Sequence, residues 1–167
     1  MLNLAPSLLI SRILTLIIAL TIHEFSHAFV ADRFGDTTAR NAGRLTLNPL
    51  KHLDVFGSLM LLLVGFGWAK PVPVNPYALR RRSDSALMWV SLAGPASNLL
   101  LAILAGFVLR FRLVPWTASG AFLPSAAEFL FTFLSINLLL MLFNLIPLSP
   151  LDGEKVLSFL LPAKLQE

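Results

Sequence analysis

Two histidines and a glutamate form the pattern H-E-x-x-H within an apolar segment of the chain. His23 and His27 lie four positions apart, and Glu24 directly follows the first histidine. Residues at this spacing share one face of a helix, so both imidazoles can bind a single Zn²⁺ ion. Glu24 is then placed to take a proton from the water that the zinc activates. The pattern predicts a hydrolytic zinc site.

The alternative is that this short pattern arose by chance. Its three ionisable side chains interrupt a stretch that is otherwise apolar. Inside a bilayer, each such side chain costs about 2.5 kcal/mol or more unless it is paired or bound to a metal. A segment without a need for them should carry leucine instead, so we favour the metal site.

A catalytic zinc site takes three protein ligands and leaves one position open. The chain has no cysteine, so the third ligand must be a histidine or a carboxylate. Asp152 is the preferred candidate because it follows an apolar segment and is framed by prolines and a glycine. Broken backbone at membrane depth is tolerated where it lines a cavity. Asp152 could instead cap the helix that follows it, and His52 and Asp54 are the alternative ligands.

The histidine pair lies in the first of three apolar segments that are each long enough to cross a bilayer. These segments are residues 8–30, 85–109 and 124–146, and about 20 residues span the hydrocarbon core. Residues 53–67 form a shorter apolar run that suits a re-entrant or half-depth helix. Only 13% of the chain is charged, against about 25% in soluble domains. We therefore expect an all-α polytopic membrane protein in which residues 1–167 form a single domain.

The metal ligands and the charges both favour three full crossings over four. A full crossing by residues 53–67 would place the histidine pair and Asp152 on opposite sides, whereas a re-entrant helix lets them converge. The three-span arrangement also gathers most basic residues on the side of the zinc site, leaving Arg110 and Arg112 opposite, together with Arg12 near the first membrane entry. By the positive-inside rule, we expect this site towards the cytoplasmic face of a bacterial cytoplasmic membrane.

Taken together, the motifs resemble those of the site-2 protease family of intramembrane zinc metalloproteases. The likeness covers nearly the whole chain and is closest to short bacterial-type members without a regulatory peptide-binding domain. Its markers are HEFSH at 23–27, GRLTLNP at 43–49, GWAKPVPVNP at 67–76, AGPASN at 93–98 and NLIPLSPLDG at 144–153. The combination of HEXXH with a distant intramembrane LDG is highly specific, whereas AGPxxN alone is weak.

The resemblance implies a role for each of the residues that match the motifs. His23, His27 and Asp152 would ligate one zinc ion per chain, and Glu24 would be the general base. Asn144 would steady the tetrahedral intermediate, although an asparagine there could instead form an interhelical hydrogen bond.

The resemblance also implies short membrane-associated β-strands near residues 43–47 and 70–74. The alternating character of residues 44–47 is compatible with a strand. Prolines in the second segment forbid a helix there and favour extended backbone. Gly94, Pro95 and Asn98 of the AGPASN motif are expected to serve helix packing rather than chemistry.

The expected reaction is hydrolysis of peptide bonds within or near the transmembrane segments of membrane-protein substrates. The main alternative is a zinc-binding membrane scaffold or chaperone that does not cleave, which the presence of Glu24 disfavours. A metal transporter would need a continuous polar path that the second and third spans lack. The basic residues flank apolar segments, which fits contact with lipid headgroups and not with nucleic acid.

Overall fold

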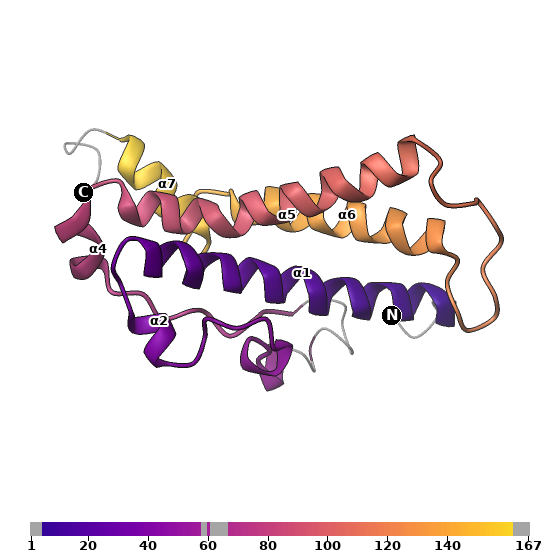
Figure 1. Ribbon diagram of the computed structural model, residues 1–167, viewed down its shortest axis with the longest axis horizontal. Helices are drawn as coiled ribbons and strands as arrows, with labels where there is room; N and C mark the ends of the chain where they lie inside the picture. Colours follow the sequence, from indigo (N-terminus) through magenta and orange to yellow (C-terminus); the bar gives the residue numbers. More distant parts are fainter. Residues whose placement is uncertain (1–4, 58–59, 61–66, 162–167) are drawn as a thin grey trace.

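Three long helices lie side by side and form the body of the molecule (Figure 1). The computed structural model describes residues 5–57, 60 and 67–161. α1 spans Pro6–Arg33, α5 spans Ala86–Arg110 and α6 spans Ala126–Asn144. α1 and α6 run in the same direction, and α5 runs against both.

All three of these helices are long and apolar enough to cross a membrane. Large apolar side chains such as Leu100 and Phe107 are more than half exposed on the outside of the bundle, while the interior holds small and polar residues such as Ser11, Thr15 and Ala102. This inverted distribution is typical of helices that pack within lipid. Most of residues 53–67, where we expected a re-entrant or half-depth helix, lies outside the described residues.

Short elements gather at the end of the bundle where α1 finishes and α5 begins (Figure 1). They are α2 (Thr38–Asn41), α4 (Pro76–Arg82) and α7 (Asp152–Leu160). A 3-10 helix, η1 (Pro49–Lys51), lies between α2 and α4 in the sequence. A buried apolar cluster joins α1, α4 and α5 at this end through Ala31, Leu79, Ala86 and Val90. This packed end holds the candidate metal centre described below.

The prediction of β-strands near residues 43–47 and 70–74 is wrong. Both segments are among the described residues and neither is a strand; the described part contains an isolated bridge between Leu53 and Ala69. The reason lies in where the backbone groups of residues 70–75 form their hydrogen bonds. The N–H groups of Val72 and Asn75 donate to the carboxylates of Glu24 and Asp36, so side chains replace the partner strand.

Candidate metal centre

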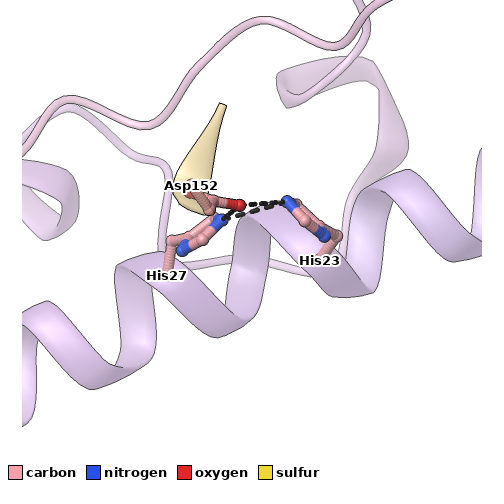
Figure 2. Close-up of side chains that lie close together, drawn as sticks. All are labelled: His23, His27 and Asp152. Carbon is pink, nitrogen blue, oxygen red and sulfur yellow. Dashed lines mark hydrogen bonds and ion pairs between the residues drawn. The ribbon is translucent and has the colours of Figure 1, made fainter. Parts of the chain in front are cut away.

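Asp152 lies beside His23 and His27 at the packed end of the bundle (Figure 2). The Oδ2 atom of Asp152 is 3.3 Å from the Nε2 atom of each histidine, and the two Nε2 atoms are 3.0 Å apart. α1 supplies both histidines from successive turns, and α7 supplies the aspartate. The structure therefore brings together the three ligands predicted from the sequence.

The distances and the donor types of this group fit a zinc ion. Ligand atoms held about 2.1 Å from a tetrahedral ion lie roughly 3.4 Å from one another, close to the separations of 3.0 and 3.3 Å found here. Imidazole nitrogen and carboxylate oxygen are both zinc ligands, and three of them leave the fourth position open. The histidines are buried, so few water molecules compete with them for the ion.

The backbone of α5 orients one of the histidine rings. His27 Nδ1 lies 2.7 Å from the carbonyl oxygen of Val90, which only an N–H at Nδ1 can satisfy. To bind a metal, His27 has to give up any proton on Nε2, and the ring then keeps its N–H at Nδ1 and directs the Nε2 lone pair towards Asp152. Metal-binding histidines nearly always donate their second ring nitrogen in this way, so the contact with Val90 supports a ligand role for His27.

Asp152 is the first residue of α7 and does not act as a helix cap. The N-cap residue is Leu151, and no side chain caps this end. Burial opposes ionisation of Asp152, but hydrogen bonds with His23 and His27 outweigh it and hold the pKa of the carboxyl well below its usual range. The side chain is therefore a carboxylate at neutral pH, which is the form that binds a metal.

Two glycines allow the ligands to approach one another. A Cβ atom on Gly94 of α5 would lie 2.6 Å from His23 Nε2 and closer still to His27 Nε2. A Cβ on Gly153 would lie 2.6 Å from the carbonyl oxygen of Ile146. Gly94 was expected to serve packing alone, but it borders the space in which the ligand atoms converge. The AGPASN motif drew attention to it, although its partner could not be known from the sequence.

Glu24 lies one position from His23 and is itself buried. Its Oε2 atom accepts a hydrogen bond of 3.0 Å from the backbone N–H of Val72. Arg44 donates to the carbonyl oxygens of Pro71 and Lys70, just before this contact. Val72 and Arg44 were not predicted as site residues. They belong to the GWAKPVPVNP and GRLTLNP motifs, and these motifs mark the two segments without showing which of their residues contact Glu24 or one another.

The other predicted candidates lie outside the ligand group. The side-chain nitrogen of Asn144 donates to the carbonyl oxygen of Leu140 at 2.9 Å, within its own helix α6. His52 Nε2 lies 2.7 Å from the carbonyl oxygen of Thr46. Asp54 accepts a hydrogen bond from the N–H of Gly57. His52 and Asp54, the alternative third ligands, are thus engaged with backbone groups elsewhere.

Comparison with known proteins gives consistent matches along the chain. Residues 11–127 match the family described as Peptidase family M50. YwhC of Bacillus subtilis, named as a candidate zinc metalloprotease, is 45% identical over 157 residues, which cover 93% of this chain and 71% of YwhC. Rip2 of Mycolicibacterium smegmatis carries the same description and is 38% identical over 148 residues, which cover 85% of this chain and 54% of Rip2. No solved structure matches the chain.

Proposed function

The chain belongs to peptidase family M50, the site-2 protease family, and we propose which residues of this intramembrane zinc metalloprotease perform the hydrolysis. The matches confirm the family, the protease activity and the zinc cofactor that the motifs predicted. We infer that His23, His27 and Asp152 hold the zinc. The convergence of their ligand atoms, from two helices far apart in the sequence, is the observation that carries this assignment.

Zinc bound by these residues supplies a Lewis acid that polarises the scissile carbonyl and makes a water molecule more acidic. Glu24 is the proposed general base. Its carboxylate is buried next to the ligand His23 and takes the proton from the attacking water. It then passes this proton to the amine that leaves when the peptide bond breaks.

Asn144 is proposed to donate a hydrogen bond to the oxyanion that develops during the attack. Its position at the end of α6, eight residues before Asp152, supports this role. In the structure its amide donates to Leu140, so the side chain has to turn away from its own helix when substrate is bound. The motif likeness, rather than the present contact, carries this part of the proposal.

The proposed substrate is a transmembrane segment of another membrane protein. Its peptide bonds are shielded by helical hydrogen bonds, so the helix must unwind locally before Glu24 can act on the water that attacks one of them. Glycine or proline near the cleavage site lowers the cost of that unwinding. We also propose that residues 1–167 act as one domain.

We propose that the zinc site faces the cytoplasm. The short elements at its end of the bundle carry Arg40 and the arginines of α4, whereas Arg110 lies at the opposite end of α5. An excess of basic residues marks the cytoplasmic side of bacterial inner-membrane proteins. A site on that side would meet substrate segments near their cytoplasmic ends.

The experiment that tests the function compares wild type with Glu24→Gln in membrane vesicles that contain a bacterial membrane proteome. Glu24→Gln keeps nearly the same shape but cannot accept the proton. Peptide sequencing should find new chain termini inside transmembrane segments with wild type and none with the variant, at equal zinc content. Identical termini with both proteins would exclude Glu24 as the base.

A further inference from the structure

The guanidinium of Arg44 joins two backbone carbonyls next to the proposed general base. Its Nη1 donates to the carbonyl oxygen of Pro71 at 3.1 Å, and its Nη2 donates to that of Lys70. Only 5% of Arg44 is exposed. The following residue, Val72, donates its N–H to Glu24 Oε2. Arg44 thus binds the backbone carbonyls that immediately precede the N–H in contact with Glu24.

The backbone around Val72 is rigid enough to couple these hydrogen bonds to the position of the Val72 N–H. Pro71 and Pro73 have no N–H, so Val72 supplies the donor between them. Proline also fixes its own φ angle and restricts the residue before it. Because this segment has little conformational freedom, the position of the Lys70 and Pro71 carbonyls determines the position of the Val72 N–H.

We propose that Arg44 is a positioning residue for the hydrolysis. By holding the carbonyls of Lys70 and Pro71, it keeps the N–H of Val72 against Glu24 and so fixes the direction of the carboxylate. The inference rests on the proposed role of Glu24 as general base. Arginine suits the task because its planar fork reaches two acceptors at once, whereas lysine carries its donors on one atom.

The test measures kcat, KM and zinc content for Arg44→Met, Arg44→Lys, Val72→Pro and the double variant Arg44→Met with Val72→Pro. The substrate is a fluorogenic peptide made from a transmembrane segment that wild type cuts in the vesicle experiment. Arg40→Met is the matched control: it removes the same charge, and Arg40 pairs with Asp32 at the surface instead of holding residues 70–72.

Arg44→Met should lower kcat by about tenfold to a hundredfold, the cost of a misplaced catalytic group, with KM and zinc content unchanged. Arg44→Lys should recover part of the loss. Val72→Pro removes the N–H and should lower kcat to a similar extent. The double variant should be no slower than the slower single variant, because both changes break the same connection. Arg40→Met should match wild type.

Wild-type kcat in Arg44→Met would overturn the proposal, as would losses that multiply in the double variant or an equal loss in Arg40→Met. A loss confined to KM or to zinc content would likewise assign Arg44 a different role. If Arg44→Met does not fold, Arg44→Lys takes its place, and its effect must then vanish when Val72→Pro is present.

Glu24→Gln, assayed beside these variants, separates this inference from the proposed function. Equal activity of Glu24→Gln and wild type would remove the general base itself, and the role of Arg44 with it. An inactive Glu24→Gln together with a fully active Arg44→Met would leave the function standing and overturn only the role of Arg44.

Discussion

Gly94 of α5 lies directly against His23 of α1, because a Cβ atom at Gly94 would be 2.6 Å from His23 Nε2. Real Cβ atoms essentially never come within 3.0 Å of a heavy atom that belongs to a residue outside their own stretch of chain. The same Cβ would also collide with His27 Nε2. The absence of a side chain at Gly94 therefore leaves room for the two histidine rings and for the ion that they are proposed to bind.

Gly94→Ala should lower zinc affinity by at least about tenfold, the usual cost of disturbing the surroundings of a metal ligand. Alanine normally stabilises the interior of a helix by about 0.5–1 kcal/mol relative to glycine. The expected loss of zinc therefore cannot come from a weaker helix. Metal titration of the purified variant in detergent measures the effect, and cleavage activity should fall with zinc content.

Gly106→Ala is the control for this substitution. It lies on the same helix, and its Cβ would approach only the flexible end of Leu134, at 3.1 Å. Gly106→Ala should bind zinc like wild type. If Gly94→Ala also bound zinc like wild type, the close approach of α5 to the ligands would not matter for the site.

Gly153→Ala should weaken zinc binding from the other side of the site. Its Cβ would lie 2.6 Å from the carbonyl oxygen of Ile146 and closer to that of Leu145, so the backbone next to Asp152 has to move. We expect about tenfold weaker zinc binding. Gly120→Ala, whose Cβ would make an ordinary contact of 3.5 Å, should have no effect. Full zinc affinity in Gly153→Ala would show that the close contact of Gly153 with the backbone of Leu145 and Ile146 does not position Asp152.

Asn144→Ala should lower kcat by about a hundredfold without changing zinc content, which is the effect of removing one donor to an oxyanion. The measurement is steady-state cleavage of a transmembrane peptide at saturating substrate. A variant with wild-type kcat and a loss of about 1 kcal/mol in stability would instead identify an interhelical or intrahelical hydrogen bond as the role of Asn144.

The proposed orientation can be tested with single cysteines, because the chain has none of its own. Trp116 and Tyr77 are 65% and 80% exposed. Tyr77 belongs to α4 and Trp116 to the segment between α5 and α6, and these two parts of the chain lie at opposite ends of the bundle (Figure 1). In intact cells, a membrane-impermeant maleimide should label Trp116→Cys, and Tyr77→Cys should react only after the membrane is permeabilised. The opposite labelling pattern would place the zinc site on the outer side.

Much of the site could be predicted because the relevant signals are local. The spacing of His23 and His27 depends only on helical periodicity, and the lengths of the apolar segments determine which helices can span. Asp152 could be assigned because a three-span arrangement brings its segment back to the end of α1 where the histidines lie. The structure agrees with that arrangement within the residues it describes.

The failures concern contacts between segments that are distant in the sequence. The strands near 43–47 and 70–74 were expected from alternating and extended patterns, which cannot show that Glu24 and Arg44 bind the backbone of residues 70–72. The contact of Gly94 with the histidines depends on how α5 is aligned along α1. Periodicity indicates which face of a helix is buried, but not which residue it meets.

The zinc content of protein purified without chelator tests the central claim most directly. Mass spectrometry of the metal should find about one zinc per chain in wild type and little zinc in Asp152→Ala and His27→Ala, because each variant lacks one of the three proposed protein ligands. Asp54→Ala, which alters a carboxylate outside the ligand group, should keep its zinc. Wild-type protein without zinc, or Asp152→Ala with a full complement of zinc, would contradict the assignment of His23, His27 and Asp152 as the metal centre.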